Sequence, residues 1–112
     1  MTPSAESIVQ RQFESYNAHD LDGFMETFAP EMWLLPEQAP LLAGKDEVRR
    51  YYREHRFNHA GLQAILLNRM IMGDTVIDHE QLIGLEIDHV IEAIAIYRIV
   101  DGLIQHVCFI RA

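Results

Sequence analysis

Residues 93–110 read AIAIYRIVDGLIQHVCFI, two apolar runs joined by Asp101 and Gly102. Asp-Gly between two apolar runs is a strong hairpin signal, because a type I′ turn needs a positive φ at both central positions. The stretch therefore predicts two antiparallel strands at the end of the chain.

Both faces of the first of these strands are apolar. Ala93, Ala95, Tyr97 and Ile99 point to one side of the strand, and Ile94, Ile96 and Val100 point to the other, with Arg98 as the one exception. An antiparallel sheet with one face in water alternates more cleanly between apolar and polar residues. We therefore expect a homodimer in which a second copy covers the sheet face that points away from the helices.

Working back along the chain, apolar residues form four strand-like runs and, before them, three helix-like segments. The runs are residues 63–72, 75–83, 90–100 and 103–111, which predicts an antiparallel meander. Helical spacing predicts helices over residues 5–17, over 20–28 with an end before Pro30, and from residue 45 to near residue 58. Residues 32–35 predict a short strand, followed by an extended loop with Pro36 and Pro40. Together these elements predict an α+β fold in which three N-terminal helices pack on the concave face of a curved antiparallel sheet.

Length and charge narrow the possible classes of protein. The chain has 112 residues, which predicts one domain over residues 1–112. Its formal net charge of -8 disfavours nucleic acid and anionic membrane surfaces as partners. Cys108 is the only cysteine, and the sequence shows neither a signal peptide nor a membrane span, so we expect a cytoplasmic location.

Four strings, in this order and spacing, resemble a known superfamily. They are VQRQFESYNAHDLDGFMETFAPE at 9–31, AGKDEVRRYYRE at 43–54, GDTVIDHEQLIG at 73–84 and IAIYRIVDGLIQHV at 94–107. The chain resembles the nuclear transport factor two-like superfamily, in its SnoaL-like and ketosteroid isomerase-like branch. The resemblance implies a cone-shaped α+β barrel around an apolar pocket, usually in a dimer. Its members include isomerases, polyketide cyclases, dehydratases, epoxide hydrolases and proteins that only bind or dimerise, so the fold does not determine the chemistry.

The residues of the ketosteroid isomerase mechanism do not carry over. That chemistry uses a carboxylate base together with a tyrosine and a protonated aspartate that stabilise an enolate. When the chain is aligned with that family, Gln12 occupies the position of the tyrosine and Ala95 that of the aspartate. The position of the base falls near residues 35–36, where the neighbouring Glu37 is the candidate carboxylate. Tyr16, one helical turn after Gln12, is a substitute for the tyrosine.

Three polar residues lie inside a strand-like run and are the candidates for catalysis: Asp78, His79 and Glu80. Alternation along a strand places Asp78 and Glu80 on one face, about 7 Å apart, and His79 on the other. Either the two carboxylates or the histidine could face the pocket and transfer protons. The alternative is that they pair with Arg69 and Arg98 on neighbouring strands or lie in a dimer interface.

Aromatic residues are the candidates for binding an apolar ligand. They are Tyr16, Trp33, Tyr52, Tyr97 and Phe109, each of which could instead belong to the core. His55 and His59 have i, i+4 spacing without the glutamate of a zinc-protease motif, so we expect no metal site, and no motif implies a cofactor. Two hypotheses follow: a cofactor-independent isomerase, cyclase or dehydratase acting on a small hydrophobic carbonyl compound, or a non-catalytic ligand-binding or dimerisation module.

Overall fold

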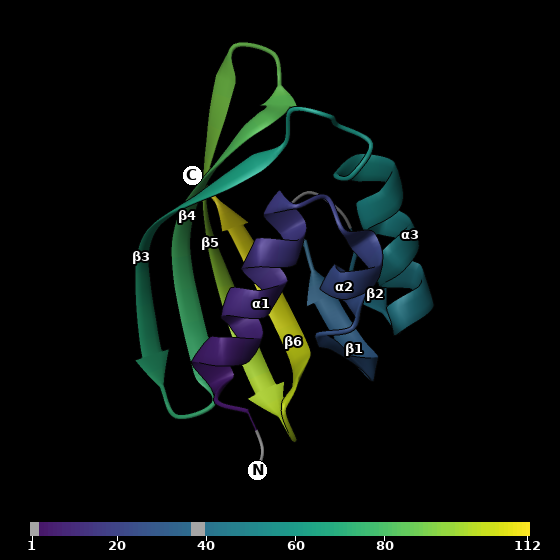
Figure 1. Cartoon of the computed structure of the whole chain (residues 1–112), viewed down its shortest axis with the longest axis vertical. Helices are drawn as coiled ribbons and strands as arrows, with labels where there is room; N and C mark the ends of the chain where they lie inside the picture. The colour runs from purple at the N-terminus through teal and green to yellow at the C-terminus, as the bar shows by residue number, and fades with distance from the viewer. Residues whose placement is uncertain (1–2, 37–39) are drawn as a thin grey trace.

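The computed structural model describes residues 3–36 and 40–112. Within these residues one curved, open sheet has the strand order β2-β1-β6-β5-β4-β3 (Figure 1). Its strands are β1 (Phe28–Leu35), β2 (Leu42–Ala43), β3 (Gln63–Met72), β4 (Thr75–Glu86), β5 (His89–Val100) and β6 (Leu103–Arg111). The helices are α1 (Ala5–Asn17), α2 (Leu21–Met25) and α3 (Lys45–His55), so the predicted α+β fold is confirmed, although α3 follows the first two strands.

The C-terminal meander matches its prediction closely. Strands β3 to β6 pair antiparallel in sequence order. Asp101 and Gly102, with φ of 53° and 78°, form the turn between Val100 and Leu103. The predicted hairpin is therefore confirmed, and the turn sets the register of the last two strands.

Strand β1 was only partly predicted. Helix α2 ends at Met25, so the prediction that Phe28 lies on this helix was wrong. Thr27 ends the helical stretch by donating its hydroxyl to the Phe24 carbonyl at 2.7 Å, and the Thr27 carbonyl accepts from the Ile104 amide at 2.8 Å. This contact starts a parallel pairing between β1 and β6, two strands far apart in the chain.

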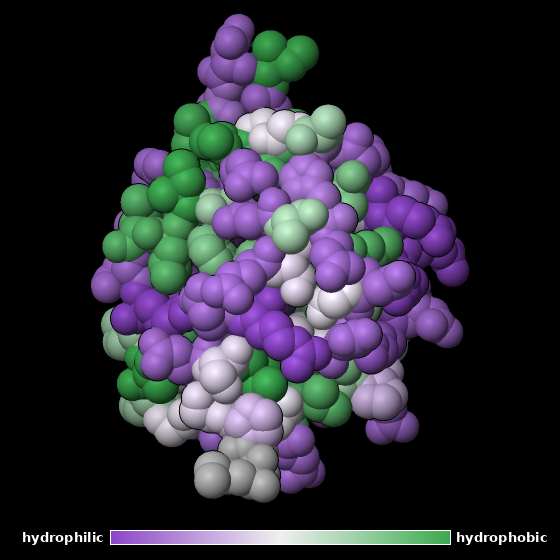
Figure 2. All heavy atoms as spheres, viewed as in Figure 1, coloured by the Kyte–Doolittle hydropathy of each residue, from purple (hydrophilic) through white to green (hydrophobic). Residues whose placement is uncertain are grey.

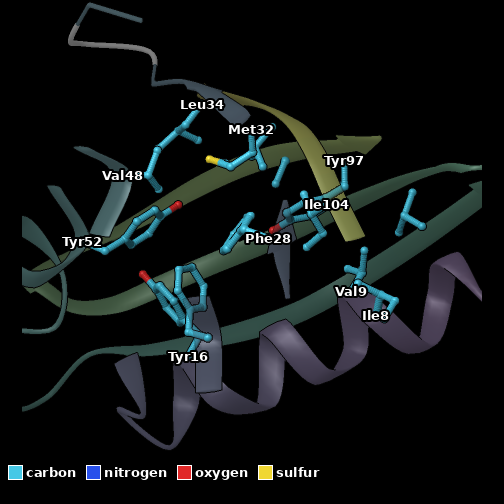
Figure 3. Packing of buried hydrophobic residues seen from close by; sticks show 14 of the residues in the cluster. Ile8, Val9, Tyr16, Phe28, Met32, Leu34, Val48, Tyr52, Tyr97 and Ile104 are labelled. Atoms are coloured by element: carbon cyan, nitrogen blue, oxygen red, sulfur yellow. The ribbon is translucent and has the colours of Figure 1, made fainter. Parts of the chain in front are cut away.

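Helix α1 lies against the concave face of the sheet, where it contacts β3, β4 and β6, while α3 packs beside β1 and β2 (Figure 1). The Ser4 hydroxyl caps α1 by accepting from the Ser7 amide at 3.1 Å. Side chains from α1, α3 and the sheet meet in one buried cluster, which includes Val9, Phe28 and Val48 (Figure 3).

None of the described helices is long and apolar enough to cross a membrane.

Exposed apolar side chains gather on the edge strand β3. Figure 2 shows them as green spheres along the left margin of this view. The exposed large apolar residues of the strand are Ile65, Leu67, Met70, Ile71 and Met72. The open edge of the sheet is therefore more apolar than the helical side of the molecule.

Candidate functional site

A small cavity of about 30 Å³ lies between the helices and the sheet. Its polar wall is formed by buried side chains from α1, α3, β4 and β5: Gln12, Tyr16, Tyr52, Glu80 and Tyr97. Its partly exposed lining residues are Phe13, Tyr51, Arg56 and Phe109. The volume is about that of one water molecule, so a larger ligand needs the partly exposed side chains to move.

Glu80 is the carboxylic acid of this cavity. Strand alternation turns it toward the helices, and it is only 6% exposed. Burial and the nearby negative charge of Asp78 raise the pKa of the Glu80 carboxyl from 4.5 to about 8, while Arg69 opposes the rise. No described residue forms a hydrogen bond or ion pair with this carboxyl. Every fully enclosed side-chain oxygen of the described residues has a hydrogen-bond partner, so the unpaired oxygens of Glu80 are not fully enclosed. The Glu80 oxygens therefore remain accessible from the cavity.

Asp78 has the same orientation as Glu80 but a different environment. Arg69 on β3 donates from Nε to Oδ1 at 2.7 Å and from Nη2 to Oδ2 at 3.0 Å, and the aspartate is 1% exposed. The guanidinium also donates to Gln10 of α1 at 2.8 Å. Asp78 is therefore held in a two-bond ion pair with Arg69, which was the alternative that the sequence left open. It does not line the cavity.

Three tyrosines supply hydroxyl groups around the cavity. Burial raises the pKa of Tyr16, Tyr52 and Tyr97 above the ordinary value, so all three remain protonated donors near neutral pH. The rings of Tyr16 and Tyr52 pack edge to face with centroids 6.4 Å apart, and Figure 3 shows them together in the interior. The Gln12 amide donates to the Tyr97 hydroxyl at 3.4 Å, so Gln12 orients one of these groups.

His79 and Trp33 lie outside this cavity. His79 points away from the helices, and its Nε2 is 2.6 Å from the Glu92 carboxylate on the outer face of the sheet. Trp33 stacks on His106 with ring centroids 4.4 Å apart, whereas its neighbour Leu34 lines the cavity. The structure thus brings Tyr16, Tyr52, Tyr97, Phe109 and Glu80 together and separates these two residues from them.

The remaining sequence candidates fall into three groups. Gln12 lines the cavity, whereas Ala95 is buried in the core and leaves no acid at the aspartate position. Glu37 lies outside the described residues. Across 3–36 and 40–112, no three histidine, cysteine, aspartate or glutamate residues are grouped so that they could hold a metal ion.

Sequence reasoning missed one charged residue of the cavity, Arg56. It follows the last residue of α3 and lines the cavity beside Tyr51 and Tyr52. The signal for it was the i, i+4 spacing from Tyr52, which places both on one helical face.

Comparison with known proteins gives one family and several similar folds. The model of the SnoaL-like domain matches residues 9–107. A proposed ketosteroid isomerase from Kribbella flavida shares 18% identity with a TM-score of 0.84, over 100% of this chain and 82% of its own. A proposed polyketide cyclase from Sinorhizobium meliloti shares 22% identity with a TM-score of 0.83, over 92% and 93%. A SnoaL-like protein of unknown function from Burkholderia thailandensis shares 19% identity with a TM-score of 0.83, over 96% and 94%.

The comparison with curated proteins found no match. At these identities the solved structures establish the fold alone, which is the nuclear transport factor two-like fold that the sequence resemblance implied. The family model covers most of the chain and includes every cavity-lining residue except Phe109. The chain belongs to the SnoaL-like domain family.

Proposed function

We propose that this protein is a cofactor-independent acid–base enzyme that isomerises, cyclises or dehydrates a small hydrophobic carbonyl compound. One observation carries the proposal: Glu80 is a buried carboxyl group without a hydrogen-bond partner among the described residues, in a cavity lined by four tyrosines, three of them buried. A buried acid without an ion-pair partner is costly to the fold, and such groups concentrate at functional sites.

In the proposed reaction, the Glu80 carboxylate removes a proton from the carbon next to the carbonyl. The electron pair of the broken C–H bond moves into the carbonyl group and forms an enolate. A tyrosine hydroxyl, from Tyr16 or Tyr52, donates a hydrogen bond to the enolate oxygen and stabilises it. Glu80 then returns the proton to another carbon for an isomerisation, or protonates a departing hydroxyl for a dehydration.

The pKa of about 8 suits Glu80 to this exchange of roles. At pH 7 about one molecule in ten carries the carboxylate, and this carboxylate is a much stronger base than an exposed one. We expect the rate of proton removal to rise with pH and to level off above about pH 8. Burial is the main cause of the raised pKa of Glu80, and the opposed charges of Asp78 and Arg69 adjust it without contact with the cavity, so these two are positioning residues in this proposal.

Proton abstraction can be tested without knowledge of the natural substrate. 2-Hexanone and cyclohexanone are incubated with the protein in D₂O, and NMR follows the exchange of hydrogens next to the carbonyl. We expect exchange above the buffer rate, which Glu80→Gln abolishes. Glu92→Gln is the matched control, because Glu92 lies on the outer face of the sheet. Equal exchange by wild type and Glu80→Gln would show that Glu80 is not the base.

A second candidate function is the non-catalytic binding module. The small volume of the cavity, about 30 Å³, favours it, because a ligand can enter only when partly exposed lining side chains, three of them aromatic, move aside. Ligand binding without exchange of any hydrogen in the D₂O experiment would favour this alternative over the enzyme.

We also propose a cytoplasmic homodimer. Its support is the outer face of the sheet, where Ile94 lies beside Ile110 and Ile77 beside Ile96. Ile94 and Ile110 are 38% and 44% exposed. A second copy brings an identical apolar patch, which a two-fold contact needs. Light scattering should give twice the chain mass, and Ile94→Arg should halve it, whereas the control Ile87→Arg at the β4–β5 turn should not. A monomer mass for the wild type would refute the proposal.

A further inference from the structure

Arg56 is the one charged lining residue of the cavity besides Glu80 among the described residues. It follows the C-terminus of α3, and its side chain is partly exposed. The guanidinium carbon lies 5.4 Å from the centre of the Tyr51 ring, and Nη1 donates to the carbonyl of the neighbouring His55 at 3.1 Å. The aromatic ring and this carbonyl hold the guanidinium beside the cavity and leave further donors available.

This arginine has no carboxylate partner in the described part of the chain, although 17 acidic residues face nine basic ones in the sequence. Four other arginines do form ion pairs with carboxylates, namely Arg11, Arg49, Arg69 and Arg111. An arginine that lines a cavity and has unused donors matches the geometry of a carboxylate, which accepts two parallel hydrogen bonds.

Arg56 and Glu80 reach the cavity from different elements, the C-terminus of α3 and strand β4. The Arg56 guanidinium lowers, and the Glu80 carboxylate raises, the pKa of both Tyr16 and Tyr52. The charges that shift the pKa of Glu80 itself are those of Asp78 and Arg69. Tyr16 and Tyr52 therefore line the same cavity as both charged groups and respond to the charge of each.

We infer that Arg56 binds the carboxylate of a small oxo acid, whose carbonyl group then reaches the hydroxyls of Tyr16 and Tyr52. This inference rests on the proposed carbonyl chemistry at Glu80 and narrows its substrate from a carbonyl compound to a carbonyl-containing monocarboxylic acid. Binding of the acid moves the partly exposed Arg56 and Tyr51 side chains from their present positions, because the cavity holds only about 30 Å³.

The overall charge of the protein makes this inference sharply testable. A net charge of -8 repels an anion, so the general field favours an uncharged ester over the corresponding acid. Preference for the acid therefore requires a local positive group at the binding site. A structural role of Arg56 at the end of α3, where a positive charge is favourable, gives no such preference.

The experiment compares two acids with their uncharged esters. NMR titrations of the labelled protein measure the Kd of 2-oxohexanoate, of 5-oxohexanoate and of their methyl esters. We expect at least one acid to bind about ten-fold more tightly than its ester. Arg56→Gln should remove this preference and leave the affinity for the ester within about two-fold. Arg53→Gln, at an exposed position in the last turn of α3, is the matched control and should keep the preference.

Three results would overturn the inference: no binding of either acid, equal Kd values of wild type for both acids and their esters, or an equal loss of preference in the two arginine variants. The wild-type comparison needs no folded variant. Glu80→Gln separates the two proposals, because it should retain the acid preference while abolishing deuterium exchange. Acid preference without deuterium exchange refutes the proposed enzyme and supports carboxylate binding by Arg56. Exchange of 2-hexanone without acid preference supports the enzyme and refutes carboxylate binding by Arg56.

Discussion

Replacing Glu80 with glutamine should stabilise the protein, and the gain should grow with pH. Glutamine has the shape of the protonated glutamic acid but cannot ionise. In the unfolded chain the carboxyl ionises above pH 4.5, whereas in the folded protein burial delays ionisation to about pH 8. A folded-state pKa above the unfolded value favours the protonated form, so wild-type stability falls as the pH rises between these two values.

The size of the effect follows from the two pKa values. Each pH unit of the interval costs the wild type about 1.4 kcal/mol. The loss reaches roughly 3 kcal/mol at pH 7 and roughly 5 kcal/mol above pH 8, and it vanishes below pH 4.5. Glu80→Gln removes this loss, so its free energy of unfolding should exceed that of the wild type by these amounts, less the cost of burying the amide.

Urea unfolding at pH 4, 7 and 9, followed by circular dichroism at one protein concentration, measures the difference. Glu54→Gln is the control, because Glu54 is exposed on α3 and its substitution should produce no such trend. The reasoning is refuted if the difference in unfolding free energy between Glu80→Gln and the wild type is no larger at pH 9 than at pH 4. The carboxyl would then be solvated or paired, and the proposed base would lose its physical basis.

Three further substitutions test the surroundings of the cavity. Asp78→Asn removes the ion pair of the partly buried Arg69 guanidinium, and urea unfolding should show a loss of about 3 kcal/mol. An unchanged midpoint would contradict the pairing. Gly84→Ala places a Cβ 2.0 Å from the Gly61 carbonyl oxygen at a φ of 78°, so its melting temperature should fall steeply, whereas Gly61→Ala meets only an ordinary contact and should melt near the wild type. Tyr16→Phe should slow deuterium exchange about ten-fold if its hydroxyl stabilises the enolate, and an unchanged rate would assign that role to another hydroxyl.

Much of the fold was predictable because its signals are local. The Asp101–Gly102 turn depends on two adjacent residues, and the predicted strands 63–72 and 103–111 end where β3 and β6 end. The missed part is the parallel pairing of β1 with β6, in which Phe28 meets Ile104. The helical spacing of apolar residues placed Phe28 on α2. Its actual place at the start of β1 depends on pairing with β6, which is distant in the sequence and leaves no local signal.

For the candidate site, the sequence by itself determined that Asp78 and Glu80 share one face of a strand and that His79 takes the other, because alternation is a property of the extended backbone. Only the tertiary structure decided that the face of the two acids is the inner one. It also decided that Arg69 pairs with Asp78 and leaves Glu80 without a partner among the described residues. The physical reason is that pKa and pairing depend on side chains from β3, α1 and α3, whose approach no local pattern encodes.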